Sequence, residues 1–592
     1  MKALIFTCLS LLLPAIAQAN GTDAARAEPE TFQEPVTTQL EPLPALRLPP
    51  AILAARAVSA FAAAAATSSP TNAITLPALS DSEIQSLRNA PNQKAFQVGI
   101  GRDLPDYLRQ PIQLDSWQWT NVSGGKVAHY TLTSTDAVRV RAQVQLSQAP
   151  AGVELRFYSP NDTSVVFGPY TATSEPFWSP TVEGDTLGLE LFLPDGVATS
   201  EVSFAIARLS HLVVNPANSQ MKSDLNTFRE EYASCQQDIA CADPSWQATG
   251  KAVARYVFTD IDGYSYICSG TVLTDKDVYT QIPYFFTAAH CVSNQTAASS
   301  MEMYWLYANS SCGGSGAVAV RTTGGATLLA TKTALDTTLV RLNQNPPSGT
   351  TLSGWTVTPL TSNQAVTGIH HALGDPLKYA QGNFVSFASV TTSSGGYTVA
   401  NDPNGDFSKV VWHTGITAPG SSGSGVWVDQ GGVHYLNGSL LGGSSECSAM
   451  DAPDEYSRFE RTWPYVSAWL GSTGTPPSLR LFDANQPATA LLDGIVITRY
   501  LQGARGSALL DGVTTRTPDL AALESQLASV MQIMDVDDDG VREAGTDGVL
   551  LMRYLLGLRG APLLQGLDVG TSTRNTPTAV STYLESILNP AS

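Results

Sequence analysis

Three short stretches of the chain contain the residue types of nucleophilic catalysis. His290 follows the apolar run 284–286 and precedes Cys291, which places it at the end of an expected strand. Asp336 lies near the start of the otherwise apolar stretch 335–340, and Ser422 lies in the glycine- and serine-rich run 419–425. A rigidly held histidine can take a proton from a serine hydroxyl, and a buried aspartate needs a partner such as an imidazole N–H. The three residues are therefore a candidate triad.

The glycines around Ser422 predict a second part of this chemistry. They would let the backbone N–H groups of Gly420 and Ser422 point at one spot, as an oxyanion hole requires. Each motif alone has an ordinary explanation, because glycine-serine runs are usually linkers, lone histidines are usually structural and such an aspartate is often in a turn. Their combination, in the order His, Asp, Ser and between cysteines, favours catalysis. We interpret His370, His371 and His413 as structural residues.

Composition and charge predict an exported protein. The chain of 592 residues has 33 Lys and Arg against 52 Asp and Glu, a net charge of -19, so nucleic acid and anionic membrane surfaces are poor partners. Lys2, the apolar run 4–16 and the ending Ala17-Gln18-Ala19 are typical of a secretory signal peptide over residues 1–19. Six cysteines lie beyond it, an even number that predicts disulfides with no pairing fixed: Cys235, Cys241, Cys268, Cys291, Cys312 and Cys447.

Changes of composition divide the rest of the chain. Residues 20–108 are rich in Ala, Pro and Thr at their start, and we expect a low-complexity propeptide or linker there. Alternation of apolar and polar residues predicts a β-sandwich pro-domain over 109–212. Residues 230–472 combine strands and turns with the candidate triad, and 473–479 is an expected linker. The aromatic residues of the sandwich could bind carbohydrate, but we expect them in its core: Trp117, Trp119, Phe177 and Trp178.

Residues 480–592 contain an internal repeat with a period of 54 residues, in which Asp493-Gly494 recurs as Asp547-Gly548. Each copy is expected to be an acidic loop followed by an amphipathic helix, which predicts a small α-helical module. The second loop resembles the EF-hand-type loops of dockerin-like calcium repeats with one residue inserted, the alternative being a solvated acidic turn. Its expected ligands are Asp535, Asp537, Asp539, Val541 through its carbonyl, and Asp547. The first copy has Leu481 at the first ligand position, so we do not expect calcium there.

Together, the triad motifs resemble the chymotrypsin-fold serine proteases, and specifically the bacterial lysyl endopeptidases. The similarity extends from about Cys235 to Trp469. It implies a mainly β protein whose protease domain is a double β-barrel, with the sandwich before it and the helical module after it. It also implies that His290 is the general base, Asp336 its orienting partner and Ser422 the nucleophile. The implied disulfides are Cys235–Cys447, Cys241–Cys312 and Cys268–Cys291.

The substrate pocket is a less direct prediction. Ile416 lies six residues before Ser422, where trypsin-like enzymes carry the pocket carboxylate, so this position alone predicts an apolar pocket. Lysyl endopeptidases carry a pocket aspartate later in the chain, and Asp454 occupies the matching place, with Gly442 and Gly443 as further pocket residues. A carboxylate in a dry pocket would select Lys or Arg strongly. The alternative is an exposed Asp454 in the acidic loop 446–455.

Two departures from the resemblance affect specificity and activation. Leu441 replaces a family histidine, and the segment 386–394 contains no Trp to stack on it, so the choice between Lys and Arg stays open. Ser421 replaces the aspartate that binds a new N-terminus in the animal enzymes, so we expect activation by unblocking of the cleft. We expect cleavage after Arg229, with Lys222 as the second candidate.

These observations predict a secreted serine endopeptidase that cleaves proteins or peptides after Lys or Arg through an acyl-enzyme. It needs no cofactor for catalysis, and we expect Ca²⁺ only in the C-terminal module, for which a protein partner is a further possibility. One alternative is a non-catalytic adhesion or scaffold protein that uses the sandwich and the dockerin-like module. Another is a protease that cleaves after apolar residues.

Overall fold

The computed structural model describes residues 72–588 apart from 89–94, 174–175, 217–219, 222–233, 277–281, 394–395, 472–477, 484–485, 514–517, 540, 570–571 and 573. The expected signal peptide, both candidate cleavage positions and most of the expected linker 473–479 therefore lie outside the described residues. Within the described part of the chain, no helix is long and apolar enough to cross a membrane.

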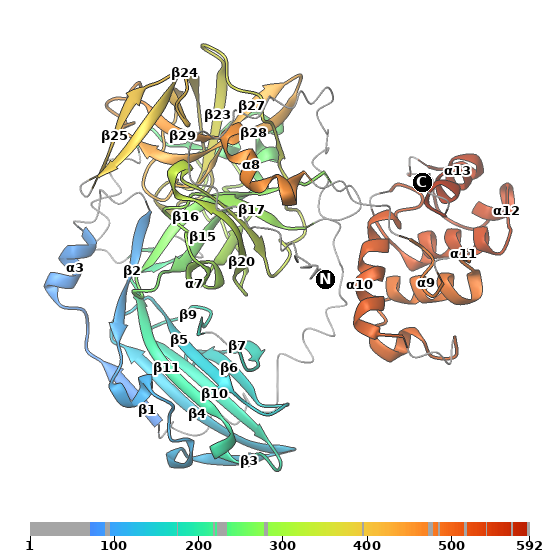
Figure 1. Ribbon diagram of the computed structural model, residues 1–592, viewed down its shortest axis with the longest axis horizontal. Helices are drawn as coiled ribbons and strands as arrows, with labels where there is room; N and C mark the ends of the chain where they lie inside the picture. Colours follow the sequence, from blue (N-terminus) through green and yellow to red (C-terminus); the bar gives the residue numbers. More distant parts are fainter. Residues whose placement is uncertain are drawn as a thin grey trace, which may run out of the picture.

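The N-terminal domain is built from two packed sheets (Figure 1, blue to teal). Apolar residues alternate along their strands and meet between the sheets, where Val144, Phe157, Leu189 and Phe204 are fully buried. One sheet contains β1 (Asn72–Leu76), β3 (Trp119–Val122), β4 (Gly125–Ser134), β6 (Glu154–Ser159), β7 (Asp162–Tyr170) and β10 (Thr186–Pro194). The other contains β2 (Phe96–Asp103), β5 (Arg139–Gln148), β8 (Phe177–Trp178), β9 (Val182–Glu183) and β11 (Ser203–Leu212).

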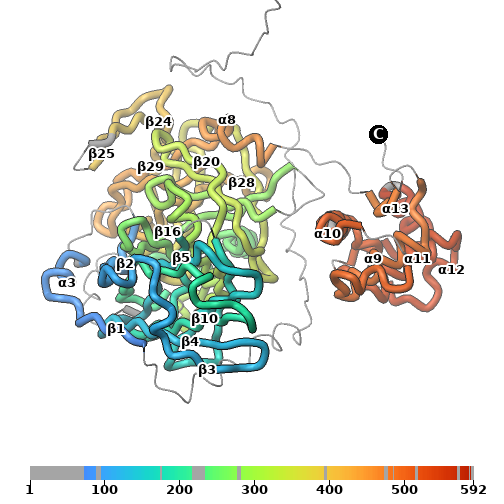
Figure 2. Tube along the Cα trace, turned by 60° about the horizontal axis from the view of Figure 1, so that its bottom comes forward, coloured from blue at the N-terminus to red at the C-terminus, as the bar shows by residue number. Residues whose placement is uncertain are grey.

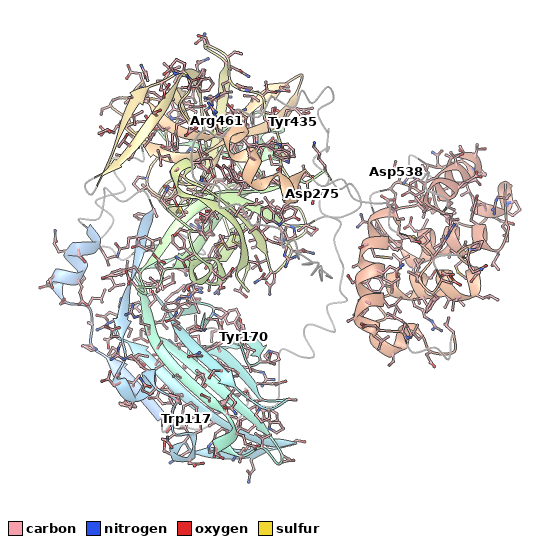
Figure 3. The ribbon with its side chains drawn as sticks, viewed as in Figure 1. Trp117, Tyr170, Asp275, Tyr435, Arg461 and Asp538 are labelled. Carbon is pink, nitrogen blue, oxygen red and sulfur yellow. A yellow bond between two sulfur atoms is a disulfide. The ribbon has the colours of Figure 1, made fainter. Side chains whose placement is uncertain are left out.

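This domain begins earlier in the chain than the sequence predicts. Residues 20–108 were expected to be propeptide or linker, but β1 pairs with β4 in parallel and β2 pairs with β11. The short strand β1 is ordered by a partner more than 50 residues away, a contact that local composition does not reveal. Three of the predicted core aromatics pack as expected, since Trp117 (labelled in Figure 3) is buried in this core and Trp119 and Phe177 pack against it. Trp178 is buried but is not part of this cluster.

The protease domain consists of two β-barrels (Figure 1, green to orange). The strands of the first are β15 (Val253–Thr259), β16 (Ser265–Leu273), β17 (Tyr284–Thr287), β18 (Glu302–Trp305), β19 (Val320–Thr322), β20 (Ala326–Lys332) and β21 (Thr337–Leu342). Those of the second are β14 (Gln237–Asp238), β22 (Gly354–Trp355), β23 (Ala365–His370), β24 (Lys378–Ser393), β25 (Gly396–Asn401), β26 (Phe407–Thr414), β27 (Gly425–Gln430), β28 (Val433–Gly443) and β29 (Asp454–Arg458).

The second barrel closes completely, because β24 pairs with both β23 and β26 and the remaining pairs run β23–β27–β28–β29–β26. Closure leaves no unpaired edge in this ring. The loops at its ends are therefore anchored on both sides by paired strands. The helix α8 (Phe459–Leu470) follows β29 and buries Phe459 against Phe286 of the first barrel. The smaller helices are α6 (Pro244–Gly250) and α7 (Gln295–Ser299) in this domain and α3 (Asp81–Arg88) and α4 (Asp106–Arg109) in the N-terminal domain.

The N-terminal and protease domains share a continuous sheet. Strand β2 pairs with β11 on one side and with β16 of the first barrel on the other. The turned view of Figure 2 also shows β2 next to β16. Behind this junction Glu302 is buried between Arg141 of the N-terminal domain and Arg321 of the barrel, at 3.7 and 2.9 Å. Burial alone would raise the pKa of Glu302, but the two guanidinium groups lower it to about 2.

The C-terminal module is helical (Figure 1, red), with α9 (Ile495–Leu501), α10 (Leu520–Val530), α11 (Val549–Leu555), α12 (Ala561–Leu564) and α13 (Pro577–Leu588) around its own apolar core. Each repeat helix begins with a wide π-helical turn, Ala490–Gly494 before α9 and Ala544–Gly548 before α11. Such a turn takes up one extra residue without breaking the helix. In the second copy this turn contains Asp547, the aspartate expected to close the acidic loop.

Candidate active site

The first barrel brings His290 and Asp336 together. His290 follows the end of β17, and Asp336 precedes β21, which pairs with β17. The Nδ1 atom of His290 lies 2.7 Å from Oδ2 of Asp336, and the backbone N–H of His290 donates to Oδ1 at 2.8 Å. Asp336 adopts a left-handed backbone with φ of 51°, which aspartate tolerates better than most residues. Both carboxylate oxygens therefore orient one imidazole.

The other imidazole nitrogen is left for a different partner. Among the described residues, Nε2 of His290 is buried and has no hydrogen-bond partner. An imidazole that donates from Nδ1 to a carboxylate presents Nε2 as a proton acceptor. This is the arrangement that general-base chemistry needs.

The second barrel supplies the loop with Ser422, which packs against the strand that leads to His290. A Cβ atom at Gly423 would stand 2.1 Å from Oγ1 of Thr287 and 2.8 Å from N of Ala288, so only glycine allows this close approach. Ser269 of β16 joins the two sides, because its N–H donates to the Ser422 carbonyl at 2.9 Å and its carbonyl accepts from Oγ1 of Thr287. The expected oxyanion residue Gly420 has φ of 92°.

Asp454 forms the base of a polar site at the start of β29. Its side chain is completely buried and accepts four hydrogen bonds, from Nε1 of Trp412 at 2.6 Å, Oγ1 of Thr417 at 2.8 Å, Oγ of Ser445 at 2.9 Å and the Ser445 N–H at 3.2 Å. The alternative of an exposed aspartate in the loop 446–455 is therefore wrong. Among the described cations, none forms an ion pair with this carboxylate.

The wall beside Asp454 is formed by glycine. Oδ1 of Asp454 lies where a Cβ atom of Gly443 would stand, at 1.9 Å, so a side chain at that position would displace the carboxylate. Burial raises the pKa of Asp454, and the hydrogen bonds from Trp412 and Thr417 work in the opposite direction. Neutral donors thus hold a desolvated carboxylate that lacks a countercharge. Ile416, the residue at the trypsin-like position, is buried in the barrel core.

Sequence reasoning missed the donors around Asp454. Trp412 lies on β26 and reads as a core residue, and Thr417 and Ser445 are common residues in loops. It also missed Tyr397 on β25, whose hydroxyl donates to Glu455 at 3.4 Å and whose pKa is raised by burial and by the nearby Glu455 and Asp454. Among these residues, Thr417 had a signal in the sequence, because it directly follows Ile416, the position at which trypsin-like enzymes carry the pocket carboxylate.

Three disulfides connect the protease domain, Cys235–Cys447, Cys241–Cys312 and Cys268–Cys291. They are the pairs that the resemblance implies. Cys268–Cys291 joins β16 to the residue after His290, and Cys235–Cys447 reaches the loop that contains Ser445. Two of the three therefore brace segments that form the site.

The acidic loop of the C-terminal module gathers three of its five expected ligands. Carboxylate oxygens of Asp535, Asp537 and Asp547 lie within 4.8 Å of one another, and Asp538 of the same loop is labelled in Figure 3. Among the described residues, Oδ1 of the buried Asp537 has no hydrogen-bond partner. Asp539 is exposed and accepts from the Val541 N–H at 2.7 Å.

Asp547 has a structural role as well. It accepts the N–H groups of Val536 at 2.6 Å and Glu543 at 2.7 Å, and burial, followed by its acidic neighbours, raises its pKa to about 7. In the first copy Asp493 accepts the N–H groups of Leu481 and Thr489, both at 2.8 Å. Both copies thus use the aspartate to close their loop, and in the second copy two further carboxylates, Asp535 and Asp537, lie close to it.

The fold and the site define a class of protein. A double β-barrel with a histidine–aspartate pair on one barrel and a serine-bearing loop on the other is a chymotrypsin-fold serine endopeptidase. Two family models match the chain, the lysyl endopeptidase N-terminal domain over residues 75–213 and the lysyl endopeptidase C-terminal domain over residues 230–457. The lysyl endopeptidase of Pseudomonas aeruginosa strain PAO1 is 31% identical over 401 residues, which cover 63% of this chain and 81% of that relative. The chain belongs to the lysyl endopeptidase family.

Solved structures of other proteases match at lower identity. The active form of the Rv3671c protease from M. tuberculosis is 13% identical, with a TM-score of 0.27, and the match covers 39% of this chain and 86% of that one. The HtrA-type protease AlgW is 12% identical, with a TM-score of 0.26, and the match covers 38% of this chain and 64% of that one.

Proposed function

We propose that the protein is a secreted endopeptidase that cleaves after Lys, with Arg as a second accepted residue. The observation that carries this specificity is the buried carboxylate of Asp454, which four neutral donors hold in place. A substrate ammonium or guanidinium group would supply the missing charge. A neutral side chain would leave the carboxylate desolvated and unpaired, which is costly.

The proposed mechanism uses His290 and Asp336 of the first barrel and Ser422 of the second. His290 takes the Ser422 proton at Nε2 while the serine oxygen attacks the carbonyl carbon of the scissile bond. Asp336 stabilises the imidazolium that forms, because both its oxygens already face His290. The N–H groups of Gly420 and Ser422 donate hydrogen bonds to the carbonyl oxygen as it gains negative charge. His290 then protonates the leaving amine, and a water molecule hydrolyses the acyl-enzyme by the same steps.

Substrate profiling of the processed protein tests both parts of this proposal. Wild type, Ser422→Ala and Asp454→Ala would be assayed on peptides varied at the residue before the cut. Asp451→Ala is a matched control, because Asp451 is an exposed carboxylate on the same loop. We expect cleavage after basic residues that Ser422→Ala abolishes and that loses its basic preference in Asp454→Ala.

The other outcomes point to the alternatives. Cleavage after aromatic or aliphatic residues by wild type would keep the endopeptidase and reject Asp454 as the specificity residue. An inactive, correctly processed wild type would favour the non-catalytic scaffold.

We propose processing after Arg229 or Lys222. This cleavage would separate the N-terminal domain from the barrels and so unblock the cleft. N-terminal sequencing of the secreted form tests this proposal. A mature N-terminus a few residues before Cys235 is expected, and one near Asn20 would contradict it.

We also propose that Asp535, Asp537 and Asp547 bind Ca²⁺, with Asp539 and the Val541 carbonyl as the remaining ligands. The unpartnered Oδ1 of Asp537 and the close carboxylates support this proposal. Calorimetry of the full-length Ser422→Ala protein would compare Ca²⁺ with a chelator. We expect the chelator to lower the melting temperature of one transition and Asp537→Asn to remove that difference. Identical melts in Ca²⁺ and in chelator would reject the site.

A further inference from the structure

The loop that holds Ser422 is fixed by buried side chains that the proposed mechanism does not use. Ser421 is completely buried, and its Oγ lies 2.9 Å from Nδ1 of His370, the last residue of β23. The same oxygen accepts the Ala418 N–H at 3.1 Å. His370 is also completely buried.

His370 and Ser421 share one buried hydrogen bond. A backbone N–H can only donate, so the Ser421 oxygen is the acceptor of the bond from Ala418. A hydroxyl oxygen has a second lone pair, so the bond to Nδ1 can run in either direction, according to the tautomer of His370. Burial, with a contribution from Lys378, lowers the pKa of His370 to about 3, which agrees with a neutral ring.

Further contacts fix the peptide planes whose N–H groups would form the oxyanion hole. The Leu373 N–H donates to the Pro419 carbonyl at 2.7 Å, and the Ser424 N–H donates to the Ser421 carbonyl at 3.0 Å. Because a peptide group is planar and trans, a fixed carbonyl oxygen sends the N–H of the next residue in the opposite direction. The N–H groups of Gly420 and Ser422 are oriented in this way.

The middle peptide of the loop is fixed from the first barrel. Oγ of Ser269 donates to the Gly420 carbonyl at 2.9 Å and accepts the His371 N–H at 3.0 Å. The Ser421 N–H turns inward and donates to the Ala418 carbonyl at 2.9 Å. A Cβ atom at Gly420 would lie 3.1 Å from the His371 carbonyl, so the segment after β23 lies directly behind the loop.

We infer that His370 is a positioning residue for the oxyanion hole and that it acts through Ser421. The pair holds the loop from inside the second barrel, so the hole needs no charged N-terminus to form. This inference rests on the proposed roles of Ser422, Gly420 and the acyl-enzyme mechanism. It extends them to a histidine that touches neither the substrate nor the reacting atoms.

The test compares substitutions of His370 that keep or remove a hydrogen-bonding partner for Ser421. In His370→Asn, the side-chain amide can donate to the Ser421 hydroxyl or accept from it, whereas His370→Leu can do neither. Ser421→Ala removes the other partner with a minimal change of volume. His413→Leu is the matched control, since His413 is exposed on β26. Each processed protein would be assayed for kcat and KM on one peptide amide with Lys before the scissile bond, and for inhibition by the corresponding peptide aldehyde.

We expect His370→Leu to lower kcat by about 10- to 100-fold, below the roughly 10²- to 10³-fold loss for deletion of one oxyanion donor. KM should stay within about twofold, and aldehyde affinity should fall with kcat because the aldehyde adduct carries the same oxyanion. His370→Asn should recover most of the activity. Ser421→Ala and His370→Leu together should cost no more than Ser421→Ala alone, because Ser421→Ala already removes the hydrogen bond that the two residues share.

Several results would overturn the inference. They are an unchanged kcat in His370→Leu, equal losses in His370→Asn and His370→Leu, or a change in KM alone. If His370→Leu does not fold, Ser421→Ala decides, and an unchanged kcat in that variant overturns the inference as well. Failure of the proposed function would look different, since wild type itself would then be inactive or would keep its activity in Ser422→Ala.

Discussion

Two buried carboxylates of the protease domain, Asp336 and Asp454, have opposite surroundings. Asp336 sits between the barrel strands β17 and β21 with both oxygens on His290, a group that can become a cation. Asp454 sits at the start of β29 with four hydrogen bonds from neutral donors and, among the described residues, no cationic partner. The first therefore has its countercharge within the protein, and the second would obtain it from the substrate.

This difference separates the two proposed tasks of the site. A carboxylate that faces its own imidazole affects every substrate equally, because the imidazole takes part in each turnover. A carboxylate that lacks a cation affects only substrates that supply one. Substitutions at the two positions should therefore differ in which substrates they affect and in whether kcat or KM responds.

The largest effect is expected at Asp336. Replacement by Asn should lower kcat about 10⁴-fold, because an amide favours the wrong imidazole tautomer and cannot stabilise the imidazolium. Steady-state assays on a lysyl ester and on an ester with a neutral side chain should show the same relative loss. A loss confined to the lysyl ester would place Asp336 in substrate recognition.

A large but selective effect is expected at Asp454. Removal of the charge in Asp454→Asn leaves a buried substrate cation unpaired, which costs about 3–5 kcal/mol, or roughly 10²- to 10⁴-fold in kcat/KM. The same variant should retain activity on the neutral ester within about threefold. Parallel losses on both esters would show that Asp454 supports the fold of the site and not its selectivity.

A smaller effect is expected for one donor that holds the pocket carboxylate. Ser445→Ala removes one of the four hydrogen bonds to Asp454 and should weaken binding of a lysyl substrate by about 1.5 kcal/mol, roughly tenfold in KM. The kcat value should hardly change. Ser448→Ala is a suitable control, because Ser448 is exposed on the same loop and its hydroxyl donates to the Glu446 carboxylate at 3.3 Å.

The smallest effect is expected from pH. Burial raises the pKa of Asp454, so this group takes up a proton at a higher pH than an exposed aspartate does. A protonated Asp454 cannot pair with a cation, and affinity for a cationic inhibitor should therefore fall as the pH decreases. Calorimetric titration of Ser422→Ala should show a loss of about three- to tenfold for each pH unit below the folded-state pKa. An affinity that stays constant down to about pH 4 would contradict the raised pKa.

Much of this site could be predicted from local motifs, because His290, Asp336 and Ser422 each lie in a short run at a strand end. The predicted double-barrel, mainly β fold and the serine endopeptidase class are confirmed. The catalytic and binding roles of individual residues remain predictions. Trp412 could not be found in the same way, since a tryptophan on a barrel strand has the same local pattern whether its N–H is used or not.

Contacts between distant segments explain the remaining misses. The strand β2 acquires a partner in β16 more than 150 residues later, and Glu302 meets Arg141 across the same junction. Neither contact has a local signature, so the N-terminal domain was predicted to begin too late. The structural interpretation of His370 is untested, and the sequence does not show its contact with Ser421.

The two π-helical turns of the C-terminal module give its repeat a common backbone geometry. Ala490–Gly494 and Ala544–Gly548 lie at corresponding positions of the repeat, and α9 and α11 begin at the next residue. Each turn contains an aspartate, Asp493 or Asp547, that accepts two backbone N–H groups of its own loop. The two copies therefore share a way of closing the loop that depends on one aspartate and not on a bound cation.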